Sequence, residues 1–216
     1  MADRAEESVK ILKVAVKMEP YEANLWADLA HAQVRIGAFE EARESGEQAV
    51  SLNPDSHEAF YTLGDAWAGL GDRAKARAQY ENAIARDPMY VPALYRMALL
   101  AQADQMWGTA IGFYAKTLLV EPDHLRAKGR LDACLLELKK ETVPVQVKAF
   151  EEVTKIEDHY VFAYEELGRL KAEQKDYAAA IEVYQKLRAK HSHPAKIRQQ
   201  IRKWKSALKA SESKKK

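Results

Sequence analysis

The stretch HEAFYTLGDAWAGLGDRAKARAQYENAIARDP, residues 57–88, decides the fold. Its apolar and small residues recur three or four positions apart in two runs, as they do along one face of an α-helix. Gly71 separates the runs, and glycine readily adopts the left-handed conformation that ends a helix. Pro88 ends the second run because proline lacks an amide donor and has a fixed φ. The stretch therefore predicts two antiparallel helices joined by a short turn.

The same pattern is repeated along the chain. Four prolines, Pro20, Pro54, Pro88 and Pro122, are each 34 residues apart. Self-similarity at such a period is the signature of a repeat architecture. The third copy, residues 89–122, has Gln105 where the earlier copies have glycine. Residues of the first copy that match the stretch quoted above at the same offsets are Trp26, Leu29, Ala30, Gly37, Ala42, Gly46 and Ala49.

The remaining segments depart from the 34-residue period in ways that a repeat array explains. A lysine-rich turn, KKETVP, lengthens the fourth copy by two residues and delays its second helix to about Pro144, a residue tolerated at the first helical position. The fifth copy restores the pattern. The ends are atypical, because terminal repeats face solvent on one side. The predicted segments are a half-repeat at 3–20, repeats at 21–54, 55–88, 89–122, 123–158 and 159–192, a capping helix at 194–210 and a disordered basic tail at 211–216.

This pattern resembles the tetratricopeptide repeat, a 34-residue helix-turn-helix with W-x2-L-G-x2-Y, then A-x3-F, then P. The resemblance covers roughly residues 3 to 210 and implies an all-α fold, a right-handed superhelical α-solenoid of about twelve helices in a single domain over 1–210. In this family the first helix of each repeat lines a concave groove, and the proteins are interaction scaffolds rather than catalysts.

Residues outside the repeat pattern on the first helices are the candidates for contact with a partner in this groove. Arg126 and Arg130 lie four apart on one helical face, and Arg96 lies one repeat earlier, so three guanidinium groups are predicted to converge on one carboxylate or phosphate. Solvated or salt-bridged arginines on an acidic body are the alternative interpretation. Tyrosines are typical binding anchors, although structural packing explains them equally well. The predicted partner-binding residues are Tyr61, Asp65, Tyr95, Arg96, Arg126 and Arg130.

The charge is distributed unevenly along the chain. The total is +2, but residues 185–216 hold 12 Lys and Arg against Glu212 alone, whereas residues 1–184 carry a net charge of −9. A basic end suggests a contact with a polyanion or with the acidic body of another copy. A charged outer face on a capping helix requires no such ligand, and this is the alternative. The predicted polyanion contacts are Lys196, Arg198, Arg202, Lys203 and Lys205.

The sequence offers little for catalysis or for metal binding. It contains no GxSxG, HExxH or glycine-rich phosphate loop. Cys134 lies among leucines and is expected to be a small buried hydrophobe. His191 and His193 are too few for a metal site. No run of about 18 apolar residues occurs, and the N-terminus lacks the apolar core of a secretory signal, so we expect a cytoplasmic protein.

The sequence thus predicts a protein without catalytic activity, metal or cofactor that binds a peptide or helical segment of a partner protein in the groove of the array. The arginine interpretation implies that this segment is acidic. Two alternatives remain open at this point. One is a self-assembling structural subunit of a larger complex, in which the half-repeat docks on another copy. The other is association with a membrane or with nucleic acid through the basic C-terminal helix.

Overall fold

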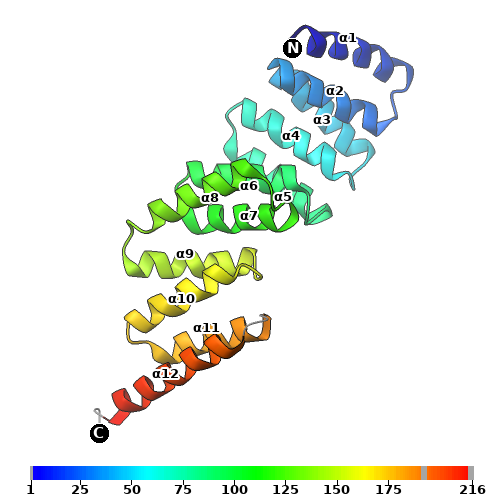
Figure 1. Cartoon of the computed structure of the whole chain (residues 1–216). Helices are drawn as coiled ribbons and strands as arrows, with labels where there is room; N and C mark the ends of the chain where they lie inside the picture. The colour runs from blue at the N-terminus through cyan, green and yellow to red at the C-terminus, as the bar shows by residue number, and fades with distance from the viewer. Residues whose placement is uncertain (1, 191–193, 214–216) are drawn as a thin grey trace. The chain divides into compact units, whose positions relative to one another are not determined.

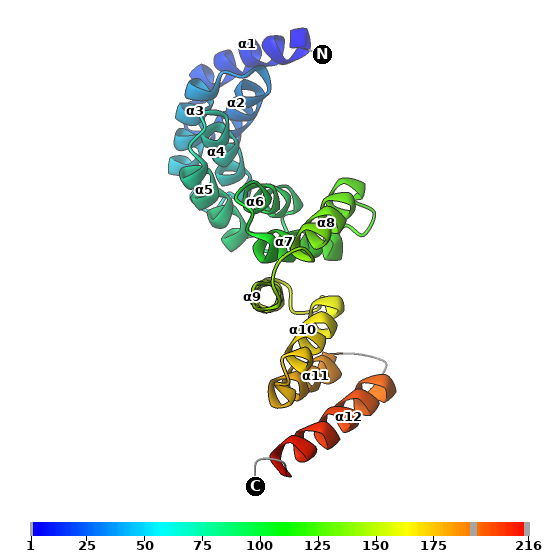
Figure 2. The same cartoon turned by 90° about the vertical axis from the view of Figure 1, so that its left-hand side faces the viewer.

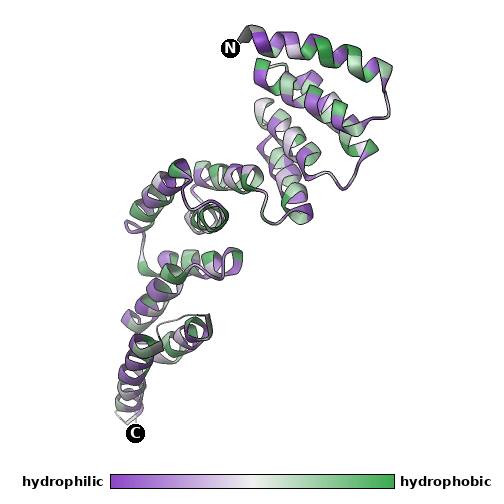
Figure 3. Ribbon diagram, turned by 45° about the vertical axis from the view of Figure 1, so that its right-hand side comes forward, coloured by the Kyte–Doolittle hydropathy of each residue, from purple (hydrophilic) through white to green (hydrophobic). Residues whose placement is uncertain are grey.

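A computed structural model describes residues 2–190 and 194–213. All regular structure in these ranges is α-helical, and most helices carry both hydrophilic and hydrophobic residues, as Figure 3 shows. The described helices are α1 (Ala2–Met18), α2 (Ala23–Ile36), α3 (Phe39–Leu52), α4 (His57–Gly69), α5 (Arg73–Arg86), α6 (Val91–Ala103), α7 (Trp107–Val120), α8 (Leu125–Leu138), α9 (Val143–Ile156), α10 (Val161–Glu173), α11 (Tyr177–Lys190) and α12 (Pro194–Ser213). The predicted all-α solenoid of antiparallel helix pairs is confirmed.

The chain forms two compact units, residues 1–100 and 101–216, and the boundary falls within α6. In the first unit α2 pairs with α3 and α4 pairs with α5, while α1 packs on α2 as the second half of a pair would (Figure 1). In the second unit α10 pairs with α11, and α12 packs on α11 (Figure 2).

The turns within helix pairs repeat one backbone geometry. Gly37 and Gly71 adopt left-handed φ values of 80° and 83°. Gln105 and Lys175 occupy the corresponding positions with φ of 57° and 64°. After each of these residues, the next amide donates to the carbonyl five residues back, for example from Ala38 to Gln33. This bond closes the helix end whether or not glycine is present, so the departure from the pattern at Gln105 does not alter the turn.

Close contact between the two helices of a pair depends on small residues. A Cβ added to Gly64 would lie 2.5 Å from the Tyr80 ring, and one added to Gly168 would lie 2.4 Å from the Tyr184 ring. Both tyrosine side chains come from the second helix of the pair. The glycine that the repeat pattern predicts in the first helix therefore makes room for the aromatic ring of its partner.

The fourth repeat packs differently from the others. Its second helix, α9, begins at Val143 with Pro144 in the first turn and packs on α7 and α10. The backbones of α7 and α9 approach closely because Gly108 has no side chain: a Cβ there would lie 2.5 Å from the carbonyl oxygen of Ala149. The repeat that has two extra residues before its second helix is thus also the one whose second helix lies against α7 of the preceding repeat.

The C-terminal helix α12 has a single apolar stripe. Ile197, Ile201 and Trp204 are buried, and the Trp204 ring meets the Tyr184 ring edge-on at a centroid distance of 4.6 Å. The helix continues to Ser213, three residues beyond the predicted end, and the hydroxyl groups of Ser211 and Ser213 donate to carbonyls of its last turns. Residues 214–216 of the predicted tail lie outside the described residues.

The contact between α7 and α9 makes a prediction about glycine. We expect Gly108→Ala to lower the free energy of unfolding by about 1–3 kcal/mol, because the new methyl group meets backbone that has no room to move. Gly129→Ala is the matched control: this exposed glycine lies within α8 with nothing within 4 Å of an added Cβ. It should raise stability by about 0.5–1 kcal/mol. Chemical denaturation measures both, and equal effects of the two variants would contradict the packing described.

Candidate protein-binding surface

A buried carboxylate organises the first helices of the N-terminal unit. Asp65 on α4 has an 8% exposed side chain and forms a bidentate ion pair with Arg96 on α6: the guanidinium Nε lies 2.8 Å from Oδ1, and Nη2 lies 3.0 Å from Oδ2. Oδ1 also accepts a hydrogen bond of 2.6 Å from the hydroxyl of Tyr80 on α5. Two predicted binding residues, Asp65 and Arg96, are therefore brought together, and each neutralises the charge of the other.

Aromatic rings surround this pair. The Tyr61 ring lies 6.0 Å from the Tyr80 ring and 5.6 Å from the Tyr90 ring, and His57 meets Tyr90 edge-on at 4.6 Å. Burial raises the pKa of Tyr61, and the negative charge of Asp65 raises it further. Burial likewise raises the pKa of Tyr90 to about 12. These phenols stay protonated and able to donate hydrogen bonds at neutral pH.

The next repeat contains a related trio in the C-terminal unit. Gln102 Oε1 accepts a hydrogen bond of 2.7 Å from the Tyr114 hydroxyl and one of 3.2 Å from Nη1 of Arg130. Tyr114 and Arg130 each stand 34 residues after their counterparts, Tyr80 and Arg96. The acceptor differs in kind and in position: it is a neutral amide, and Gln102 stands 37 residues after Asp65, whose counterpart in the 34-residue frame is Leu99. The guanidinium of Arg130 is therefore held in place by Gln102 without being neutralised by it.

The other predicted binding residues occupy separate positions. Tyr95 is half-buried on α6 in the N-terminal unit, and Arg126 is exposed in the first turn of α8 in the C-terminal unit. Arg96 belongs to one unit and the other two arginines belong to the other. The convergence of three arginines on one ligand stays a prediction. Tyr80 and Tyr114 are not among the predicted binding residues, although the 34-residue spacing of both the tyrosines and the arginines is visible in the sequence.

The basic residues predicted near the C-terminus share one location. They project from α12 on the sides not used for packing, and all are exposed. The apolar stripe of the helix faces α11, so its packing and its basic surface do not compete. These exposed residues are Lys196, Arg198, Arg202, Lys203 and Lys205.

Groups that suit catalysis or metal binding are sparse in the described part of the chain. Cys134 is buried, and burial raises the pKa of its thiol to about 11, which disfavours the reactive thiolate. Glu157, Asp158 and His159 lie together at the turn before α10, where the buried Glu157 carboxylate accepts a hydrogen bond from the His159 amide. That bond gives the acidic residue a structural role. His191 and His193 lie outside the described residues.

No helix in the described ranges is long and apolar enough to cross a membrane.

The paired helices, the 34-residue frame and the recurring turn define a helical repeat protein of the class that builds interaction surfaces. The tetratricopeptide repeat family model matches residues 27–88 and a second tetratricopeptide repeat model matches residues 162–193. Tetratricopeptide repeats therefore occur in both units of the chain.

Relatives share parts of this chain. It is 30% identical over 124 residues to human Superkiller complex protein 3, and the alignment covers 54% of this chain and 8% of that protein. It is 34% identical over 87 residues to the Hsp70-Hsp90 organizing protein of Triticum aestivum. This alignment covers 40% of this chain and 15% of that protein. The chain thus spans a small part of the length of these relatives. They support a protein-interaction scaffold.

A solved structure confirms the fold. The crystal structure of YrrB, described as a TPR protein with an unusual peptide-binding site, aligns with a TM-score of 0.54 at 15% identity. The alignment covers 93% of this chain and 97% of that one. At this identity the likeness concerns the fold alone.

The buried pair makes a prediction about stability. We expect Asp65→Asn to lower the free energy of unfolding by about 1–3 kcal/mol, because Arg96 loses its counter-ion. The loss is limited because the Arg96 side chain is partly exposed to water. Tyr80→Phe, which removes one hydrogen bond to the same carboxylate, should cost about 1 kcal/mol. Chemical denaturation of the single and double variants gives the coupling energy.

A matched control for this measurement is Arg169→Gln, which breaks an ion pair with Glu166 whose arginine side chain is 49% exposed. Its effect should stay below about 1 kcal/mol. A loss on Asp65→Asn no larger than that of the control would show that the buried carboxylate does not organise this surface.

Proposed function

We propose that the chain is a cytoplasmic scaffold without catalytic activity that binds a segment of a partner protein along the first helices of its repeats. The tetratricopeptide repeats and the relatives described above support an interaction role. The single observation that carries the finer proposal is the contrast between the two trios: Arg96 forms a bidentate ion pair with a carboxylate, whereas Arg130 donates one hydrogen bond to a neutral amide.

The trios assign different roles to the predicted binding residues. Arg96 is paired with Asp65, so this part of the surface offers a neutral, rigid and aromatic anchor that includes Tyr61. Tyrosines of this kind supply contact area at a low cost in conformational entropy. Arg130 is fixed by a neutral amide, and the exposed Arg126 stands one helical turn before it. We therefore assign recognition of an acidic group on the partner to Arg126 and Arg130.

Capture of partners from the native lysate tests this proposal. Tagged wild-type chain should retain a protein that Arg126→Ala with Arg130→Ala loses and that Tyr61→Ala retains weakly. Mass spectrometry identifies the captured protein, and circular dichroism confirms that each variant is folded. Adding Arg202→Ala with Lys205→Ala on α12 tests whether its exposed basic face contributes a second contact with an acidic partner.

Lys128→Ala is the matched control, because Lys128 is an exposed cation on the same helix two residues from each arginine and so on a different face. Capture by this variant should equal that of the wild type. Equal capture by the wild type and by all of these variants would contradict a role for the first helices.

Self-association is a second candidate function, and one observation favours it. Ile11, Val14 and Met18 on α1 are 62%, 57% and 77% exposed. In the next repeat Ser45 and Leu52, which correspond to Ile11 and Met18, are buried and half-buried respectively. Gln48, the counterpart of Val14, is exposed, so the comparison concerns Ile11 and Met18. We propose that a second copy covers this row of α1.

Sedimentation velocity tests self-association over a range of concentrations. The wild type should show a mass that rises with concentration, and Ile11→Lys with Val14→Lys should abolish this rise. Leu136→Lys is the matched control, since Leu136 on α8 is 60% exposed. A monomeric wild type at all concentrations would exclude this candidate.

A further inference from the structure

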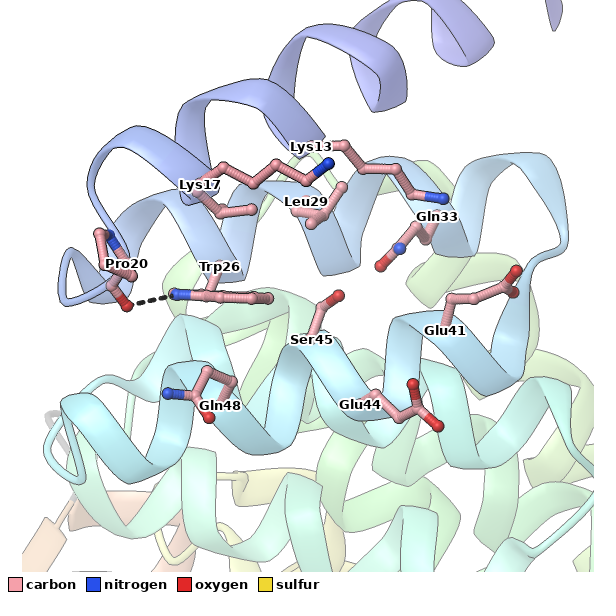
Figure 4. A pocket seen from close by; sticks show the side chains of 11 residues that line it. Lys13, Lys17, Pro20, Trp26, Leu29, Gln33, Glu41, Glu44, Ser45 and Gln48 are labelled. Atoms are coloured by element: carbon pink, nitrogen blue, oxygen red, sulfur yellow. Dashed lines mark hydrogen bonds between the residues drawn. The ribbon is translucent and has the colours of Figure 1, made fainter.

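A groove lies between α1 and α3 in the N-terminal unit, above α2, with a cavity volume of about 680 Å³. Val16, Trp26 and Leu29 form its apolar part. Figure 4 shows the side chains of Lys13 and Lys17 extending from α1 on one side and polar side chains of α3 on the other. The groove is formed by other residues than those of the Asp65 surface. Those that α3 contributes are Glu41, Glu44, Ser45 and Gln48.

The next repeat shows what the same place holds when the chain fills it. The residue 34 positions after Gln33 is Trp67, which rises from α4 between α3 and α5. Its ring is covered from both helices: the ammonium of Lys75 lies 4.0 Å from the ring centroid, and the guanidinium of Arg43 lies 5.7 Å away. In the first repeat the smaller side chain of Gln33 stands at this position and lines the groove. The side-chain amide of Gln33, oriented so that both its oxygen and its nitrogen have hydrogen-bond partners, donates to Ser45 Oγ at 2.8 Å.

The other end of the groove is also uncovered in the first repeat. In the second repeat the guanidinium of Arg86 stacks on the Phe60 ring at 3.9 Å and its Nε donates to the carbonyl of Pro54. Leu52 stands at the position of Arg86 in the first repeat. The Trp26 indole, which corresponds to Phe60, itself donates to the carbonyl of Pro20 at 2.8 Å. Trp67 and Arg86, which cover the groove of the second repeat, are thus replaced in the first repeat by the smaller Gln33 and the uncharged Leu52.

We propose that the groove between α1 and α3 receives an aromatic side chain of a partner protein, an indole above all. The internal repeat supplies the argument for this occupant, because an indole fills the equivalent place in the same chain. The chemistry of the groove matches it as well. Val16 and Leu29 offer apolar contact, the ammonium groups of Lys13 and Lys17 suit the face of an aromatic ring, and the carboxylates of α3 accept a hydrogen bond from an indole N–H.

Titration of the full chain with N-acetyl-L-tryptophanamide tests the proposal without any partner. Backbone amide spectra from nuclear magnetic resonance should shift at residues of α1, α2 and α3, with a dissociation constant on the order of 1 mM, since one side chain buries little surface. N-acetyl-L-leucinamide, an aliphatic probe, should bind at least about tenfold more weakly because it lacks the ring face and the N–H donor.

Gln33→Trp is the decisive variant, since it places the indole of the second repeat in the first. It should abolish the shifts while raising the midpoint of thermal unfolding. Gln199→Trp, the same substitution at an exposed position of α12, should leave binding unchanged. If Gln33→Trp does not fold, Lys13→Glu with Lys17→Glu at exposed positions serves instead and should weaken binding about tenfold through loss of the cations.

Three outcomes would overturn the proposal: no shifts with the indole probe, shifts that persist in the folded groove variant, or equal binding of the leucine probe. None of these depends on Tyr61, Arg126 or Arg130, so failure here is distinguishable from failure of the partner-binding proposal.

Discussion

The close approach of the two helices in each pair is the constraint on which the other features depend. In the first unit the ring of Tyr80 lies over Gly64, and any Cβ at that position would overlap the ring. This packing buries the ring and delivers its hydroxyl group to the first helix, where it meets Asp65. Because a buried hydroxyl needs a partner, the packing and the polar contact are specified together. Arg96 then completes the arrangement from the following repeat.

The acceptors that meet the equivalent tyrosines differ in chemistry and in position. Tyr80 with Asp65 and Tyr114 with Gln102 show the same tyrosine donating to a charged acceptor in one repeat and a neutral one in the next. A repeat protein tolerates such changes because each repeat packs mainly on its neighbours, so a polar substitution at the surface does not disturb distant ones. Differences between repeats, rather than the features they share, are therefore where we propose that a partner is recognised.

The helices and their turns could be predicted from the sequence because they depend on local periodicity and on the 34-residue frame. The frame also located Asp65 and Arg96 on first helices. It did not reveal that they pair, because residues 31 apart meet only once the repeats have stacked. The position of α9 against α7 was missed for a similar reason: Gly108 permits the contact, but a glycine within a helix does not by itself identify its neighbour. Left-handed Gln105 and Lys175 show that the turn follows from the hydrogen-bond pattern even where glycine is replaced.

The N-terminal groove also bears on the stability of α1. This helix packs on α2 through a small cluster that includes Val9, Val16 and Leu29. Val16 and Leu29 line the groove as well, so an occupant would contact the same apolar surface that holds α1 in place. Any ligand that binds only the folded state stabilises that state by an amount that grows with its concentration. A side chain seated between α1 and α3 would therefore join α1 to the array by the same kind of contact that Trp67 makes with Arg43 of α3 and Lys75 of α5.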